Sequence, residues 1–419
     1  MHSNWQWWIT LIVFTLTYAA LAVGKVPRLR IDRAGIAFVG AALMLILRVL
    51  TIRQATSPES VDYETLLLLL GMMVVVGYLR MSGFFIRVGH LALDRIKTPR
   101  GLLAATIVLS GILSAFLVND IVCLALTPLV LHLARKRHCN PVPHLIGLAT
   151  AANIGSTGTI TGNPQNMIIG VQSAIPYLHF ALRLMPVALL GLVIDFAVIS
   201  ILYRQALSPN ATNEVTGPEL EDRPPHGRAV RRLLRKSVFA ALVSVVLFFC
   251  GLNIALVAIG AAGFLMLNRL HPQRIYREID WTLILMFIGL FMVVHAFQVH
   301  VVSGWGVEKW DWILAHPIDR LSIAAAALSN VVSNVPAVLL FEPVMHAMPE
   351  ASRNQAWLAL AMSSTFAGNL TILGSVANLI VVENARREGV NVGFWEYCKV
   401  GIPVTLLTLA LGIAWLMLT

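Results

Sequence analysis

Two hydrophobic stretches of this 419-residue chain carry the same interruptions, repeated about 215 residues apart. Residues 113–129 align without gaps on residues 328–344, and residues 153–168 align on residues 365–380. In both copies Gly, Asn, Ser, Thr and Pro break an otherwise apolar run. In membrane proteins, interrupted segments at corresponding positions of two halves point to a transporter's binding site. The duplication therefore limits the chain to folds in which two halves meet at their interruptions.

The composition is that of a polytopic membrane protein. Hydrophobic residues make up 58% of the chain and charged residues 12%, and the mean hydropathy is +0.77. Apolar runs long enough to cross a bilayer, about 17–25 residues, recur along the chain. The net charge of +10 comes from Lys and Arg in short loops between these runs, where membrane topology explains them. We therefore expect a lipid bilayer as partner and no nucleic acid.

The pattern predicts an all-α protein with about ten transmembrane helices and two re-entrant hairpins. The predicted spans are residues 5–24, 34–50, 63–80, 142–172, 179–203, 237–252, 253–270, 280–302, 355–385 and 396–418, and the predicted hairpins are residues 101–134 and 318–348. Basic residues flank 101–134 on both sides, which indicates that both of its ends face the cytoplasm.

The same charges predict the orientation of the chain. With both hairpins re-entrant, both termini lie outside and 25 of the 31 Lys and Arg residues lie inside. The chain then divides into an N-terminal half (1–203), a cytoplasmic linker (204–236) and a C-terminal half (237–419) of inverted topology. The second hairpin would open to the outside, and the protein would lie in the plasma (inner) membrane.

Two of the predicted spans, 142–172 and 355–385, are expected to be broken. Pro164 removes a backbone donor and clashes with the preceding turn, and Gly162 permits unusual dihedral angles. Segment 374–378 repeats this pattern without the proline. Unwound backbone inside a membrane persists only where it is packed in protein or lines a wet cavity.

The hairpin tips and the breaks are predicted to form one binding site. Helix N-termini suit an anion, whereas unwound carbonyls and amide side chains suit a small hard cation such as Na⁺. The candidate solute- and ion-binding residues are Asn119, Asp120, Thr161, Gly162, Asn163, Asn166, Ser333, Asn334, Gly374, Ser375 and Asn378. The candidate Na⁺ ligands among them are Asn119, Asn166, Asn334 and Asn378. The alternative is that these small residues only allow close helix packing.

Asp120 differs from the other candidates because it is an acid at a predicted hairpin tip. A carboxylate in the membrane costs roughly 2.5–3.5 kcal/mol on insertion scales, so it is usually paired or functional. We interpret Asp120 as the group that couples transport to a proton or cation, with a neutral buried acid as the alternative. Asp195 and Glu383 lie nearer the ends of their spans and are expected to be structural.

Four motifs resemble the citrate-transporter-like and arsenite-permease branch of the ion transporter superfamily. They are VNDIVCLALTPLVL (118–131), NIGSTGTITGNPQN (153–166), SNVPAVLL (333–340) and GSVANLI (374–380). The Asn-Asp followed by Thr-Pro is similar to arsenite permeases and the melanosomal P protein. Sodium–dicarboxylate symporters instead carry Ser-Asn-Thr at each hairpin tip. The resemblance implies a scaffold domain, a moving transport domain and, in many members, a homodimer.

Together these features favour a secondary active transporter of a small anion or oxyanion-like solute, an inorganic oxyanion or a carboxylate, coupled to Na⁺ or H⁺. A Na⁺/H⁺ antiporter that uses Asp120 is a second transporter hypothesis. A membrane enzyme is the alternative of another class, but the sequence contains no HExxH, GxSxG or Walker motif. We expect no catalytic residues and no cofactor other than the coupling ion.

Overall fold

The computed structural model describes residues 4–23, 31–94, 96–208, 227–268, 271–303 and 311–419. These residues form helices and connecting turns, and no strand occurs among them. Six helices are long and apolar enough to cross a membrane, and three shorter apolar helices accompany them. The prediction of an all-α membrane protein is confirmed.

The first half contains α1 (Asn4–Val23), α2 (Arg33–Ile46), α3 (Ile52–Ala55), α4 (Tyr63–Met81), α5 (Phe84–Leu93), α6 (Pro99–Phe116), α7 (Asn119–Lys136), α8 (Val142–Ser156), η1 (Ile160–Gly162), α9 (Pro164–Ser173) and α10 (Tyr177–Leu202). The second half contains α11 (Arg228–Phe249), α12 (Ile254–Met266), α13 (Pro272–Tyr276), α14 (Trp281–Phe297), η2 (Gln298–Val302), α16 (Asp311–Leu314), α17 (Asp319–Val332), α18 (Asn334–Ala347), α19 (Glu350–Ala367), η4 (Ile372–Gly374), α20 (Val376–Arg387) and α21 (Phe394–Leu418). Much of the predicted linker, residues 209–226, lies outside the described residues.

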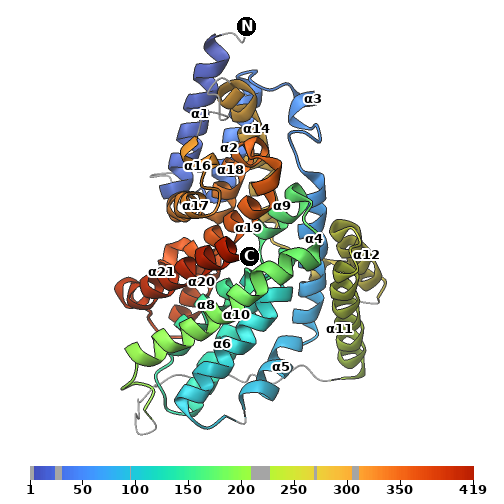
Figure 1. Cartoon of the computed structure of the whole chain (residues 1–419). Coiled ribbons are helices and arrows are strands. Elements are labelled where there is room, and N and C mark those ends of the chain that lie inside the picture. The colour runs from blue at the N-terminus through green and yellow to red at the C-terminus, as the bar shows by residue number, and fades with distance from the viewer. Residues whose placement is uncertain (1–3, 24–30, 95, 209–226, 269–270, 304–310) are drawn as a thin grey trace.

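The helices pack in two groups (Figure 1). In the first group α2 packs against α1 and α14, and α4 packs against α11 and α12, a helix pair at one side of the molecule. In the second group α8 packs against α6, α7 and α10, while α19 packs against α17 and α21. The groups meet where α4 touches α9 and where α14 touches α18. Elements from both halves of the sequence contribute to each group.

Both predicted hairpin segments consist of two helices separated by a sharp break. Residues 101–134 fall in α6 and α7, which are separated by Leu117 and Val118, and residues 318–348 fall in α17 and α18, which are separated by Ser333. Ser333 has φ 82° and ψ 159°, a conformation that is almost confined to glycine. The side of the membrane to which each pair opens stays a prediction.

Both predicted helix breaks are present. Each break consists of an α-helix, one turn of 3₁₀ helix and a second α-helix: α8, η1 and α9 in the first copy, and α19, η4 and α20 in the second. Asn163 caps α9 and Ser375 caps α20, each by accepting a backbone N–H bond on its side chain. The second half-helices therefore begin at Pro164 and Val376, two residues before Asn166 and Asn378.

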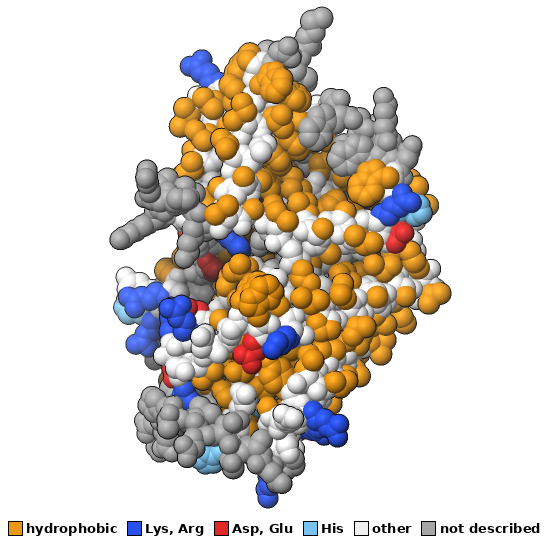
Figure 2. Space-filling view, turned by 90° about the vertical axis from the view of Figure 1, so that its left-hand side faces the viewer, with side chains coloured by type: hydrophobic (Ala, Val, Ile, Leu, Met, Phe, Trp, Pro, Cys, Tyr) orange, Lys and Arg blue, Asp and Glu red, His pale blue; other side chains and the backbone are white. Residues whose placement is uncertain are grey.

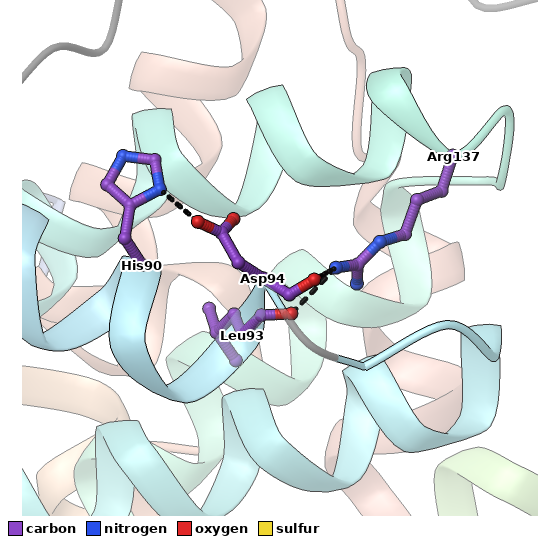
Figure 3. Close-up of polar contacts among 4 residues, drawn as sticks. All are labelled: His90, Leu93, Asp94 and Arg137. Atoms are coloured by element: carbon purple, nitrogen blue, oxygen red, sulfur yellow. Dashed lines mark hydrogen bonds and ion pairs between the residues drawn. The ribbon is translucent and has the colours of Figure 1, made fainter.

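The short amphipathic helix α5 was not predicted from the sequence. Arg137, which follows α7, donates from Nη2 to Leu93 O at 2.6 Å and to Asp94 O at 3.2 Å (Figure 3). His90 Nδ1 lies 3.0 Å from Asp94 Oδ2 in the same cluster. Because the guanidinium satisfies carbonyls at the end of α5, it attaches this helix to the second arm of the first hairpin pair.

Large apolar side chains remain exposed along the long helices. Examples are Leu16 (63% exposed), Leu182 (63%), Leu256 (72%) and Leu406 (60%). Figure 2 shows hydrophobic side chains over much of one face, with many of the charged side chains gathered near its lower and outer parts. An apolar surface of this extent suits contact with lipid rather than water.

Candidate functional site

The two helix breaks are held by the same hydrogen bonds. Asn166 and Asn378 each donate from Nδ2 across their own break to two backbone carbonyls that the broken helix leaves free. The acceptors are Ser156 O at 3.1 Å and Thr159 O at 2.9 Å for Asn166, and Gly368 O at 2.7 Å and Thr371 O at 3.0 Å for Asn378. All six residues obey the spacing of 212 that relates the two copies. The asparagines therefore supply donors to unwound backbone that would otherwise be unsatisfied.

The predicted glycines allow close backbone approach at each break. A Cβ atom on Gly162 would lie 2.2 Å from Ser156 O, and a Cβ atom on Gly374 would lie 2.8 Å from Gly368 O. Both distances are shorter than van der Waals contact permits, so neither position accepts a larger residue without backbone movement. The packing interpretation thus accounts for these two glycines.

A second pair of bonds joins the two breaks to each other. Asn163, at the start of α9, donates to Thr365 Oγ1 at 3.3 Å, and Ser375, at the start of α20, donates to Asn153 Oδ1 at 3.0 Å. Residues 163 and 375 are equivalent in the repeat, and so are residues 153 and 365. The cap residue of each second half-helix therefore contacts the first half-helix of the other copy.

Asn153 is the centre of this network and is not among the predicted site residues. Its Oδ1 accepts from Asn119 Nδ2 at 3.0 Å, and its Nδ2 donates to Asn369 Oδ1 at 2.8 Å and to Asn378 Oδ1 at 3.0 Å. All four amide side chains are buried. We call Asn119, Asn153, Asn369, Ser375 and Asn378 the central cluster. It connects the tip of the first hairpin pair to the second break.

Three amide oxygens near the breaks have no partner among the described residues. They are Asn119 Oδ1, Asn166 Oδ1 and Asn330 Oδ1, and all three are buried. Asn334, with its amide oriented to donate, bonds to Gly374 O at 3.3 Å and Ser364 O at 3.2 Å. Hard cations bind to uncharged oxygen atoms of this kind. Asn119 Oδ1 and Asn166 Oδ1 therefore have capacity left for a cation, whereas Asn378 Oδ1 already accepts from Asn153. Na⁺ binding at these residues stays a prediction.

Asp120 and Ser333 lie apart from this network, in the wall of a cavity of about 560 Å³. Arg33, Asp32 and Asp280, at the starts of α2 and α14, line the same cavity. Its remaining lining residues include Asn330, Thr282, Met286, Leu373 and Val376. Arg33 Nη1 lies 3.5 Å from Ser333 Oγ, at the limit of hydrogen bonding. The cavity thus lies between the two hairpin tips and the first helix group.

The predicted residues do not all share one surface. Thr161 Oγ1 lies 2.8 Å from the Tyr177 hydroxyl, toward α10, and Thr161 does not line the cavity. Asn163 and Asn166 lie in the packed network, whereas Asp120 is half-buried beside the cavity. The structure therefore separates a cavity with charged walls from an amide network behind it.

Asp195 is more deeply buried than its position in the sequence suggested. Its side chain is fully buried, and Thr150 Oγ1 lies 2.8 Å from its Oδ1. The expectation that Asp195 is solvated near the end of its span is therefore wrong, because α10 turns this residue toward α8. Glu383 is half-exposed and pairs with Arg386 and Arg387 on α20, as a structural surface acid does.

Comparisons with known proteins agree with this architecture. The chain is 32% identical to the silicon efflux transporter LSI3 of Oryza sativa subsp. japonica, over 96% of both chains. It is 25% identical to the putative transporter arsB of Dictyostelium discoideum, over 99% of this chain and 92% of that one. The fold matches the Neisseria gonorrhoeae antimetabolite efflux pump MtrF with a TM-score of 0.64 at 11% identity, over 98% and 94% of the chains. The profile of the citrate transporter family matches residues 9–362. These relatives are membrane transporters and not enzymes, and the chain belongs to the citrate transporter family.

Proposed function

We propose that this protein is a secondary active transporter that moves a small oxyanion-like solute by alternating access, driven by a gradient of Na⁺ or H⁺. The observation that carries the proposal is the cavity between the hairpin tips and the starts of α2 and α14. It is bounded by both helix groups, so relative movement of the groups would change its access.

The charges of the cavity favour one kind of solute. Arg33 offers a guanidinium, which binds oxyanions well, but Asp32, Asp120 and Asp280 line the same space. A polycarboxylate such as citrate would meet these acids. A weak oxo acid with several hydroxyl groups would instead donate to the carboxylates and accept from Arg33. The names of the relatives from rice and Dictyostelium, silicon efflux and arsB, agree with this class.

The two helix groups supply the other parts of the proposal. The first group, with α1, α2, α4, α11, α12 and α14, would be the scaffold, and the second would be the transport domain. The coupling ion would bind at Asp120 or at the unpartnered oxygens of Asn119 and Asn166. We place the protein in the plasma membrane with both termini outside, as a homodimer whose halves 1–203 and 237–419 are inverted.

Uptake into proteoliposomes tests the proposal with a panel of silicate, arsenite, phosphate and citrate, with and without a Na⁺ or pH gradient. We expect saturable uptake of a hydroxylated oxo acid, with citrate transported at least tenfold more slowly. Arg33→Gln should lower uptake strongly, whereas Arg53→Gln, at an exposed arginine of α3, should not. If no solute moves while a Na⁺ gradient drives proton flux, the antiporter hypothesis is correct instead.

A further inference from the structure

We propose that Asp195 is a proton-binding site within the membrane, separate from Asp120, and that its proton is linked to the central cluster. The proposal deepens the proposed function because it assigns a second ion-binding group to the transporter. Proton binding at Asp195 can nevertheless be measured without any transport.

The surroundings of Asp195 do not support a carboxylate charge. The side chain is fully buried, seven residues before the end of α10 at Leu202. Among the described residues, no Lys, Arg or His forms an ion pair with it. An unpaired carboxylate inside a membrane is costly, whereas a protonated carboxyl is not.

The contacts of Thr150 show where the proton belongs. Thr150 Oγ1 lies 2.8 Å from Ile146 O and 2.8 Å from Asp195 Oδ1. A hydroxyl has one hydrogen, and a backbone carbonyl has none to give. If Asp195 were ionised, the Thr150 hydroxyl could donate in only one of these two contacts. The other contact would then place two oxygen atoms 2.8 Å apart with no hydrogen between them. A proton on Asp195 Oδ1 satisfies both, since Thr150 then accepts from Asp195 and donates to Ile146.

Thr150 also connects Asp195 to the central cluster. Asn369 Nδ2 donates to Thr150 O at 3.2 Å, and Asn369 Oδ1 accepts from Asn153 Nδ2 at 2.8 Å. Thr150 and Asn153 lie one turn apart on α8. A cation at Asn119 would alter the bonds of Asn153, and the change would reach Thr150 through α8 and through Asn369. Ion binding at the tip and proton binding at Asp195 should therefore affect each other.

The titratable groups around Asp195 come from the elements that pack against α10. Helix α10 packs against α21, α8, α6, α11, α19 and η1. Helix α21 carries Glu396, Tyr397, Cys398 and Lys399, and both Asp195 Oδ2 and the Tyr397 hydroxyl are buried without a hydrogen-bond partner among the described residues. His144 lies near the start of α8, and its two ring nitrogens contact Asn140 O at 2.9 Å and Pro99 O at 3.1 Å. Helix α6 has Arg100 and helix α19 has Glu350 and Arg353, all in the first turn. The titratable residues of α11, from Arg228 to Lys236, lie within its first nine residues, and η1 has none.

Infrared spectroscopy of the purified protein in lipid nanodiscs tests the proposal. We expect a C=O stretching band of a protonated carboxyl at neutral pH, lost in Asp195→Asn and retained in Asp120→Asn. Thr150→Val should shift this band because the hydroxyl acceptor is gone, whereas Thr150→Ser should leave it in place. Addition of Na⁺ should shift the band in the natural protein and not in Asn153→Ala.

The proposal is overturned if Asp195→Asn has the same carboxyl bands as the natural protein. It is also overturned if the position of the C=O band changes neither in Thr150→Val nor on addition of Na⁺. Should Asp195→Asn fail to fold, the Thr150→Val and Thr150→Ser pair decides the assignment alone. A band that behaves as expected in a protein that transports no solute of the panel would support the proton site and contradict only the proposed function.

Discussion

Among single residues, Asn153 has the widest consequences for the site, because the first hairpin tip and the second break meet at its amide. Asn153→Ala would leave Asn369 Oδ1 and Asn378 Oδ1 without their donor and would remove the acceptor of Asn119 and Ser375. A buried polar group without a partner costs about 1–3 kcal/mol. We therefore predict a clear fall in the thermal unfolding midpoint, together with loss of transport.

The repeat offers a matched control for this variant. Thr365 is the counterpart of Asn153, but it only accepts bonds from Asn163 and Gln165, and Asn163 keeps its bond to Ser156 Oγ. Thr365→Ala should therefore lower the unfolding midpoint less and leave measurable uptake. Equal effects of the two variants on midpoint and uptake would show that Asn153 is an ordinary packing residue.

At the scale of elements, the first hairpin pair gives a direct test of topology. We predict that cysteines placed at Arg100 and at Lys136, at the start and at the end of the α6–α7 pair, react with an impermeant thiol reagent from the cytoplasmic side only. The charge flanking both ends is the reason. The four native cysteines are first replaced by serine, and a cysteine at Arg53 serves as the control for the outer side. Labelling of positions 100 and 136 from opposite sides would exclude a re-entrant pair and the inverted topology.

The elements that the sequence predicted well are those with local signals. Pro164, Gly162 and Gly374 disfavour continuous helix whatever surrounds them, so the breaks appear where expected. Helix α5 has only ten residues, which is too short for a membrane span, so hydropathy over span-length windows does not reveal it.

The composition of the site was harder to predict because it depends on tertiary contacts. Asn153 is the first residue of the motif at 153–166, but its counterpart in the second copy is Thr365. Identity between the two copies therefore does not mark Asn153 as a site residue. Its bonds cross from one copy to the other, and alignment of the copies does not reveal such a crossing. The contribution of Arg33 and the burial of Asp195 likewise depend on which helices pack together.

For the whole molecule, the proposed transport requires that the two groups of helices move relative to each other around the cavity between them, and that an ion gradient drives this movement. A channel or a facilitator would let the solute equilibrate, whereas a coupled transporter concentrates it. Asp120 and Asp280 line the same cavity, but Asp280 also caps α14 by accepting from Leu283 N at 3.0 Å. Asparagine caps helices about as well as aspartate, so Asp280→Asn is a matched change of charge.

The most direct test is accumulation of the transported oxo acid in proteoliposomes under an imposed Na⁺ or pH gradient without ATP. We predict that the natural protein raises the internal concentration above the external one, and that Asp280→Asn, which lacks one carboxylate of the cavity, still does so at a higher external concentration. Collapse of the gradient should abolish this accumulation in both. Asp120→Asn should still exchange solute across the membrane but should not concentrate it. Equilibration without accumulation in the natural protein, or full accumulation by Asp120→Asn, would contradict the account.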